Sequence, residues 1–545
     1  MLKKVLAAFI GILLTQQEVI GADNFFGPLL NFRNTDGEKW NLSALVVAPQ
    51  NTDPSSLTLS FRNSDETLSP SLIDTVQGQN FWNYTMSLAR GELEQKITYQ
   101  IGSKAFDIFV PVQHTDPHVF FGSCNEYADL SSPTWKNIQS VHGTTPYHVA
   151  FYAGDQIYLD TYRSVFDLPS IKPVFSQTSD KIKAFNTTPE IEEQITTFVL
   201  EHYQQHYSKP DFSTFVGSVP AQNMSDDHEY FNGKGSYYEI PPLLETVTKV
   251  ADRFYYLFQH HTKKENAASI ELIGPDGVDS HSLLTQFENS AFYALDTRSE
   301  RTPSQVTSSA SRQFMFDRLN ELPQQNIFVI TGLPLVYQNF HLIEFGVNLF
   351  GYTDLAKNFM RSLNNDSVPW FANLNVTTDF MDQWSHPNHI QEKKEILQNL
   401  DKLVSKGKTV TLLGGDAHSA SAGEVLDSAS RVRMRQLTSS ALTSSPTPDL
   451  AVGLKELNRN LQGVTSLGNN LTERLIILRN MAATGETSMD LARNNWLDLT
   501  LEPNGSYPLF FVNSASQDPK AKPLEIWLPA GWTYPKGNSN FTVDY

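Results

Sequence analysis

In the C-terminal third of the chain, an aspartate and a histidine stand two residues apart after an apolar run. The run is "TVTLLGGDAHSAS", residues 409–421, in which two glycines precede Asp416 and His418. Carboxylates and imidazoles bind metal ions and transfer protons. A single D-x-H pair is a weak signal, so its meaning depends on whether other segments bring partners to it.

Two more apolar runs end on a glycine followed by a chemically active side chain. "HVFFGSC" (118–124) ends on Cys124, and "HVAFYAGDQIYLD" (148–160) carries Asp155 and Tyr158 after its glycine. In sheets packed between helices, ligands collect at the carboxyl ends of the strands, where glycine lets the backbone turn sharply. We therefore expect three strands to deliver these side chains, with Asp416 and His418, to one rim.

A fourth segment, "NMSDDHEYFNG" (223–233), is a loop rich in groups that coordinate metals or transfer protons. Three aspartates, a thiolate, a histidine and a tyrosine gathered together would hold two or more metal ions. Asp226 and Glu229 flank Asp227 and His228, and for both outer residues we expect a role in orienting a neighbour or capping a helix rather than contact with a metal. The spacing leaves open whether Asp226 or Asp227 is the metal ligand.

The pattern of apolar and polar residues in the elements that must position these side chains changes near residue 115. From 41 to 112, short alternating segments such as "WNYTMSL" and "KITYQIG" predict a small antiparallel sandwich. After it, apolar runs alternate with helical stretches at 189–207 and 389–407, which predicts an α/β domain. The Ser/Thr-rich "QLTSSALTSSPTP" (436–448) and the polar tail from about 517 are expected to be surface loops.

Composition argues against nucleic acid as a partner. The 545 residues carry 41 Lys and Arg against 59 Asp and Glu, a formal charge of -18, with no basic cluster. Such a field repels a polyanion and suits cations bound through oxygen. Cys124 is the single cysteine, so no internal disulfide can form. Taken alone, it is either a small buried apolar residue or a metal ligand.

Residues 1–22 are typical of an export signal. Lys3 and Lys4 precede the apolar run "VLAAFIGILL", and small residues end at Ala22, so we expect the mature protein to begin at Asp23. We find no second apolar stretch long enough for a transmembrane helix. The expected location is therefore secreted, either periplasmic or extracellular.

The segments "FGSC", "GDQIYLD", "SDDHE", "LDTRSERT" and "GGDAHSA", in this order, resemble the PhoD-like branch of the metallophosphatases, the alkaline phosphatase D family. The resemblance covers about residues 25–510. It implies a four-layer αββα sandwich preceded by a small all-β sandwich. The predicted division is a signal peptide (1–22), the β-sandwich domain (23–115), the catalytic domain (116–510) and a C-terminal extension (511–545).

The resemblance also implies the metals and their ligands. The family holds iron and calcium, although other divalent metals would suit the second position. By motif, the iron ligands are Cys124, Tyr158 and His418, the bridging carboxylate is Asp155, the ligands of the second metal are Asp227 and Asp416, and His228 lies by the leaving-group oxygen. The chemistry agrees, because thiolate and phenolate favour trivalent iron while carboxylates suit a hard divalent ion.

Four residues admit two interpretations. Arg298 and Arg301 in "LDTRSERT" either bind the substrate phosphate or form structural ion pairs. In "MDQWSHPNHIQEK", Asp382 matches the family, whereas His386 and His389 depart from its pattern. For those two histidines we expect a surface or helix-capping role.

The implied function is a secreted, metal-dependent phosphoesterase that hydrolyses phosphate monoesters or diesters with metal-activated hydroxide. A serine esterase is disfavoured because the chain has no G-x-S-x-G. A zinc peptidase is disfavoured because "YFN" follows His228 and Glu229 and H-E-x-x-H is absent. The alternative from another class is a catalytically decayed, secreted binding or adhesion module that uses the β-sandwich. Every ligand type is in place, which favours the enzyme.

Overall fold

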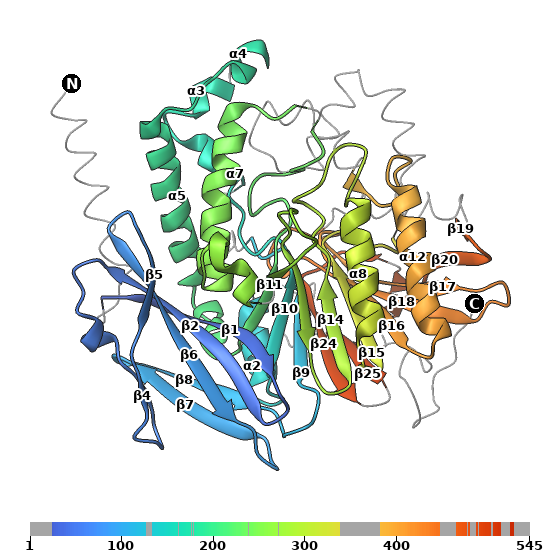
Figure 1. Cartoon of the computed structure of the whole chain (residues 1–545), viewed down its shortest axis with the longest axis horizontal. Coiled ribbons are helices and arrows are strands. Elements are labelled where there is room, and N and C mark those ends of the chain that lie inside the picture. The colour runs from blue at the N-terminus through green and yellow to red at the C-terminus, as the bar shows by residue number, and fades with distance from the viewer. Residues whose placement is uncertain are drawn as a thin grey trace.

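The computed structural model describes residues 24–126, 133–161, 163–175, 177, 179–237, 239–270, 272–337, 382–446, 465–476, 478–479, 487–488, 490–502, 505–513 and 524–527. Two large sheets lie face to face between two layers of helices, which is the four-layer αββα sandwich expected (Figure 1). Within those residues, no helix combines the length and apolar character needed to cross a membrane. The predicted signal peptide, 1–22, lies outside them.

The first large sheet has 10 strands and combines both ends of the described chain. In spatial order its strands are β26 (Leu524–Trp527), β25 (Gly505–Val512), β24 (Asn495–Glu502), β9 (His118–Gly122), β10 (Val149–Ala153), β11 (Ala221–Met224), β1 (Phe26–Thr35), β2 (Lys39–Pro49), β6 (Gln79–Ala89) and β5 (Ser71–Val76). β9, β10 and β11 run parallel to one another, so their carboxyl ends share one edge.

The second large sheet, also of 10 strands, is parallel at its centre. Its order is β12 (Leu272–Ile273), β13 (Ser282–Gln286), β14 (Ser290–Ala294), β15 (Asn326–Thr331), β16 (Thr409–Gly414), β18 (Val432–Ser439), β17 (Ala420–Leu426), β20 (Leu471–Ile476) and β19 (Thr465–Gly468), with β23 (Asp490–Leu491) beside β17. β21 (Leu478–Arg479) and β22 (Thr487–Ser488) form a separate pair.

Helices cover the outer faces of both sheets. α2 (Thr134–His142), α5 (Pro189–Tyr207), α6 (Phe212–Val216) and α7 (Pro242–Phe254) lie on the first sheet, and α8 (Ser309–Glu321) and α12 (Ile390–Ser405) lie on the second. The short helices α3 (Lys172–Phe175) and α4 (Ser179–Lys183) lie beyond the end of α5 (Figure 1). A π-helical turn, Tyr255–Gln259, extends α7, and three short 3₁₀ turns span Pro54–Leu57, Val165–Asp167 and Lys264–Ile270. Both helical stretches expected from the sequence are present as α5 and α12. α5 begins where Thr188 caps its first turn and Pro189 occupies a first-turn position.

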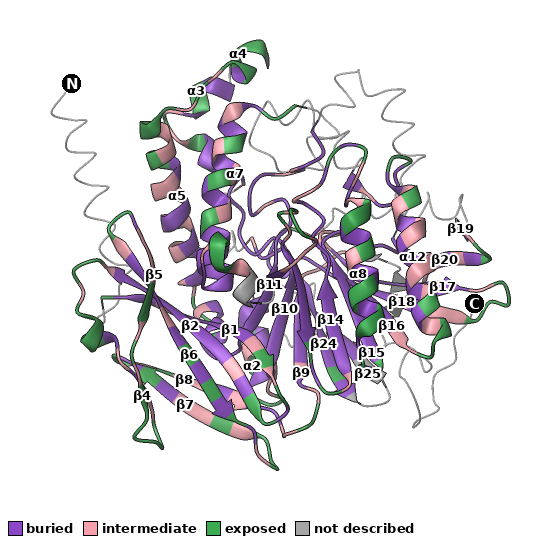
Figure 2. Cartoon of the chain, viewed as in Figure 1, coloured by how far each residue is buried: buried purple, intermediate pink, exposed green. Residues whose placement is uncertain are grey.

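Alternation along single strands separates the layers. In β10, Ala150 and Tyr152 belong to the core under α5 and α7, whereas Val149 and Phe151 belong to the core between the sheets. Such continuous apolar runs are typical of strands buried on both faces. Figure 2 shows the central strands buried and the outward faces of the helices exposed.

The segments predicted as an N-terminal sandwich form strands. A four-stranded sheet, β4 (Thr67–Leu68), β3 (Leu59–Phe61), β7 (Gln95–Ile101) and β8 (Lys104–Val110), shares its core with β2 and β6. However, β1 pairs with β11 at Asn31 and Ala221, so the first large sheet continues across residue 115. β26 of the expected C-terminal extension also lies in that sheet. The proposed domain limits at 115 and 510 therefore stay predictions.

Candidate metal centre

The loops after parallel strands of both large sheets meet at one place. They carry Cys124 after β9, Asp155 after β10, Asp226 and Asp227 after β11, Arg298 after β14, Asp416 after β16 and Ser440 after β18. The three strands expected from the sequence exist, but β16 lies in the opposite sheet from β9 and β10. The site is thus built across the junction of two sheets and not along one rim.

Several of these residues have a strained backbone. Cys124, Asp155, Asp416 and His418 have φ values of 59°, 56°, 54° and 52°. Non-glycine residues rarely adopt positive φ, and such strain gathers at functional sites. The preceding Gly154 also has positive φ, and a Cβ there would lie 2.4 Å from Asp226 Cβ. The tight turn that presents Asp155 therefore requires glycine before it.

Two overlapping groups of side chains have the spacing of metal ligands. One is Asp155, Asp227 and His228, and the other is Asp155, Asp226, Asp227 and Asp416, with ligand atoms within 4.8 Å of one another in each group. Because both groups contain Asp155 and Asp227, the arrangement suits a pair of adjacent cations. Asp226 Oδ2 and Asp227 Oδ1 are buried and accept no hydrogen bond from the described residues, which fits a bound cation.

Softer donors lie on the other side of Asp155. Cys124 Sγ is 3.4 Å from Asp155 Oδ2, and Tyr158 Oη is 3.4 Å from His418 Nε2. His418 Nδ1 lies 2.8 Å from the Ser445 carbonyl, an outer contact that orients Nε2 toward Tyr158. The residues predicted as iron ligands are therefore neighbours, joined to the carboxylate cluster through Asp155.

Burial and mutual repulsion govern ionisation in the cluster without metal. Burial, followed by the charges of Cys124 and Asp227, raises the pKa of Asp155 far above its usual range. Burial and the charge of Asp227 also raise the pKa of Asp416. Buried like charges need a cation or protons to balance them.

For Asp227 and His418, neighbouring charges shift the pKa in the direction opposite to the effect of burial. Burial would raise the pKa of Asp227, but the charges of Arg298 and His228 lower it to about 2. Burial would lower the pKa of His418, but the charge of Cys124 and its hydrogen bond raise it to about 9. His418 in turn lowers the pKa of Cys124 against the effect of burial, so the two favour a thiolate–imidazolium pair.

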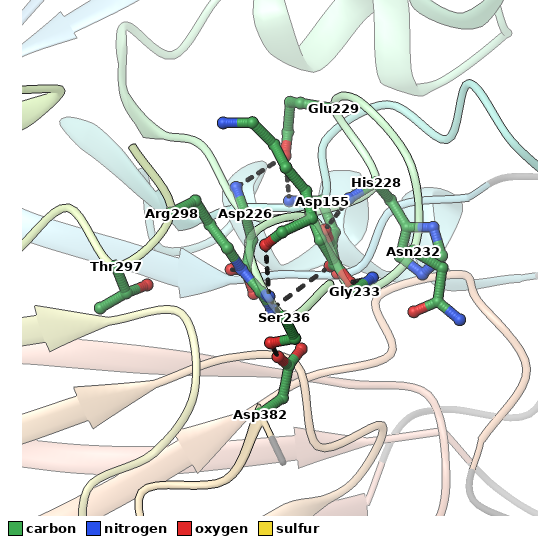
Figure 3. A network of polar contacts seen from close by, with 12 residues as sticks. Asp155, Asp226, His228, Glu229, Asn232, Gly233, Ser236, Thr297, Arg298 and Asp382 are labelled. Atoms are coloured by element: carbon green, nitrogen blue, oxygen red, sulfur yellow. Dashed lines mark hydrogen bonds and ion pairs between the residues drawn. The ribbon is translucent and has the colours of Figure 1, made fainter. Parts of the chain in front are cut away.

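His228 lies at the edge of the cluster, and its side chain is 12% exposed. Its Nδ1 is 2.7 Å from Asp160 Oδ1, and its ring stacks on Tyr158 with 4.2 Å between centroids. Its backbone N–H donates to Asp155 Oδ1 at 3.1 Å. The imidazole is thus oriented by the carboxylate of Asp160 and the aromatic face of Tyr158. Figure 3 shows His228 beside Asp155, which both groups contain.

Glu229 organises the two loops that carry the aspartates. Its carboxylate accepts the backbone N–H groups of Asp155, Gln156 and Asp226 at 2.9, 2.7 and 2.8 Å. The expectation that it orients its neighbours is confirmed.

Arg298 and Arg301 belong to a buried ion-pair network. Arg298 contacts Asp226, Asp227 and Asp382, and Arg301 contacts Asp382 and Ser236. Both arginine side chains are 0% exposed. The substrate role predicted for them stays a prediction, and the ion pairs of the second interpretation are present.

Two expectations about surface segments are wrong. Residues 436–444 are buried, because β18 lies inside the sheet and the hydroxyls after it meet internal partners. Ser440 Oγ donates to Cys124 Sγ at 3.1 Å and accepts the His418 N–H at 2.9 Å. His386 and His389 are also buried, which contradicts a surface position, whereas the alternative of a helix end holds for His389, the N-cap residue of α12, although its side chain makes no capping hydrogen bond. A hydrophilic composition suggested exposure in both cases, but internal hydrogen bonds allow polar segments to be buried.

Asp160 and Ser440 were not recognised from the sequence. Asp160 closes the motif "GDQIYLD", so a carboxylate that orients the histidine could have been sought there. Ser440 gives no such signal, since its contacts arise from pairing of β16 with β18.

Comparisons with known proteins agree with this geometry. The family model described as PhoD related phosphatase matches residues 123–358. An uncharacterized protein of Saccharomyces cerevisiae is 28% identical over 407 residues, which are 64% of this chain and 57% of that protein. The chain therefore spans little more than half the length of that relative. A solved structure titled "Structure of PhoD" covers 92% of this chain and 88% of its own, with a TM-score of 0.54 and 12% identity, and so shares the fold.

Proposed function

The chain is a PhoD-like protein, and we propose that it is a metal-dependent phosphoesterase that hydrolyses phosphate monoesters or diesters. The observation that carries the proposal is the group of four carboxylates, Asp155, Asp226, Asp227 and Asp416, with the thiol of Cys124 3.4 Å from Asp155 on its other side. Two metal ions that act together on a phosphate ester lie about 3.5–4 Å apart, and a carboxylate placed between two donor sets, as Asp155 is, suits such a spacing. A phosphatase-like function is what the family match supports.

The donor set supports different metals at the two positions. Cys124, Tyr158 and His418 offer sulfur, phenol oxygen and imidazole beside Asp155, which suits trivalent iron. Asp227 and Asp416 offer carboxylates, which suit calcium or another hard divalent ion. When bound, two such ions neutralise phosphate oxygens and lower the pKa of a coordinated water.

The chain itself supplies the proton for the leaving group. His228 lies by the cluster and is more exposed than Asp160, which holds its Nδ1. We assign it the transfer of a ring proton to the departing alkoxide oxygen as the P–O bond breaks, after which the neutral ring is reprotonated from solvent. Asp160 holds the tautomer and stabilises the protonated ring.

Elemental analysis combined with an ester panel tests this function. Purified protein should contain iron and calcium, absorb visible light through phenolate-to-iron charge transfer, and hydrolyse mono- or diesters until a chelator is added. Full activity in metal-depleted protein would reject the proposed function. An active, colourless protein that holds only zinc would reject the assignment of iron and calcium.

Secretion is a further part of the proposal, supported by the composition of residues 1–22. N-terminal sequencing of the exported protein should find Asp23 or a residue near it first. Recovery of exported protein that retains Lys3 and Lys4 would contradict removal of this segment.

A further inference from the structure

The guanidinium of Arg298 is buried among protein oxygens, which is unusual for a residue that binds substrate. Its Nε donates to Asp226 Oδ1, and its Nη1 donates to Asp382 Oδ2 at 2.8 Å and to the Lys234 carbonyl at 3.4 Å. Its Nη2 faces Asp227 Oδ1 at 3.5 Å. Two of the three guanidinium nitrogens, Nε and Nη1, thus donate hydrogen bonds to protein oxygens, whereas Nη2 is buried beside Asp227 without a hydrogen-bond acceptor among the described residues. Figure 3 shows the guanidinium between Asp226 and Asp382.

The surroundings of Arg298 exclude solvent. Its side chain is 0% exposed, and those of Asp226, Asp227 and Asp382 are 0%, 3% and 7% exposed. A substrate phosphate could reach Nε or Nη1 only by displacing a buried carboxylate, and a buried charge left without its partner is costly. It could reach Nη2 only by entering the solvent-excluded space beside Asp227.

Two of its partners belong to the four-carboxylate ligand group of the metal centre. A fixed positive charge beside this group lowers its net negative charge, and with it the attraction for cations. The rigid fork of arginine also holds Asp226 and Asp382 at set positions, which the single ammonium of lysine cannot do.

We propose that Arg298 is the internal counter-ion of the metal centre and a positioning residue, pairing with Asp226 and Asp382, and that it does not contact the substrate. The loop at 232–236 supports this arrangement from the other side. Its Gly233 N–H donates to Asp227 Oδ2 at 2.6 Å, while Ser236 Oγ donates to Asp382. Neutralising Asp226 should therefore compensate for the loss of Arg298. The role rests on the proposed metal-dependent function.

The calcium dissociation constant, measured by calorimetry after calcium removal, tests the pairing. Arg298→Gln should bind calcium about tenfold or more tightly, since a charge within ~4–6 Å shifts an ionisation by about 1–3 pKa units. Asp226→Asn should bind calcium more weakly. The double variant Asp226→Asn/Arg298→Gln should return close to wild type. Arg298→Lys keeps the charge but not the fork, so its calcium affinity should lie between those of wild type and Arg298→Gln, and it covers the case in which Arg298→Gln does not fold.

A matched control is Arg312→Gln in α8. Arg312 is also a buried arginine between two carboxylates, Glu392 at 3.0 Å and Glu395 at 2.9 Å, but it contacts no member of the ligand groups. Its substitution should lower the melting temperature and leave calcium affinity unchanged. If Arg312→Gln binds calcium more tightly by the same factor as Arg298→Gln, the gain is not specific to the metal centre and the counter-ion role is overturned.

Two other results would also overturn it. In the first, Arg298→Gln keeps the wild-type calcium affinity but raises KM for phosphate esters, and the double variant Asp226→Asn/Arg298→Gln does not restore KM. This result would mean that Arg298 contacts substrate. If Arg298→Gln binds calcium more weakly and the double variant is no better, Arg298 only supports the fold. Wild-type protein that binds no metal at all counts against the proposed function itself, whereas metal binding that is insensitive to these variants counts against the counter-ion role alone.

Discussion

Asp160 holds the imidazole of His228 from behind: its Oδ1 is 2.7 Å from His228 Nδ1, and its Oδ2 accepts the Asn232 N–H at 2.6 Å. Asp160 is buried, while His228 reaches the edge of the cluster. A carboxylate in this position selects the ring tautomer and favours the protonated ring. In the proposed function, the ring nitrogen opposite Asp160 transfers the proton to the leaving group.

Replacing Asp160 with asparagine should slow hydrolysis of alkyl phosphates by about ten- to a hundredfold, the usual cost of losing an outer partner of this kind. The same variant should hydrolyse 4-nitrophenyl phosphate at near the wild-type rate, because nitrophenolate leaves without a proton. The comparison of kcat for the two esters is the measurement. An equal loss on both esters would mean that Asp160 only supports the loop.

Asp416 and His418 should affect different metals. Asp416→Ala removes a carboxylate from the four-residue group, so activity should fall and recover in part at high calcium. His418→Ala should lose iron and activity together, without rescue by calcium. Loss of a metal is worth several kcal/mol of barrier, or about a thousandfold in rate. Metal content and turnover of the folded variants are measured, and retained metals with a retained rate would remove that residue from the site.

Ser440 should tune the sulfur ligand. Ser440→Ala removes the hydrogen bond to Cys124 Sγ, and hydrogen bonds to a ligating sulfur influence the metal's electronic properties. We expect a shifted visible absorption band and a lower reduction potential of the iron protein, with Ser440→Thr close to wild type. Identical spectra and potentials for wild type and Ser440→Ala would show that the hydroxyl serves only the backbone of His418.

Metal binding should release protons. Without metal, the pKa of Asp155 and that of Asp416 lie above the values of an unfolded chain, chiefly because of burial. Each such carboxyl favours the folded metal-free protein below its unfolded pKa, and this contribution is lost as pH rises through the raised folded value. Bound cations reverse the preference by stabilising the carboxylates.

The measurable consequence is that calcium affinity falls as pH is lowered toward the carboxylate range. Calorimetry in buffers of different ionisation enthalpy should show net proton release on binding. Binding that is independent of both pH and buffer would indicate carboxylates that are already ionised, against the effect expected from burial.

Local sequence determined the elements and much of the donor set. The apolar runs of β9, β10 and β16 end on glycines, and these signals lie within a few residues of Cys124, Asp155 and Asp416. Gly154 turns the chain with a positive φ, whereas a Cβ at Gly122 would lie 2.9 Å from Leu442 and one at Gly415 would lie 2.6 Å from Ser123. The spacing of apolar residues likewise predicted α5 and α12. Such features depend on neighbours along the chain, so one sequence suffices to find them.

Only the tertiary structure decided which of these groups meet. Ser440 approaches Cys124 because β18 pairs with β16 while the two large sheets pack together, and Arg298 reaches Asp226 from the opposite sheet. Asp226 and Asp227 are adjacent in sequence, yet the contact of one with Arg298 Nε and of the other with the Gly233 N–H distinguishes them. A serine can support a thiolate, and an arginine can lie among carboxylates, because both are buried with their partners. That burial arises from contacts between distant segments, which residue types and spacing do not encode.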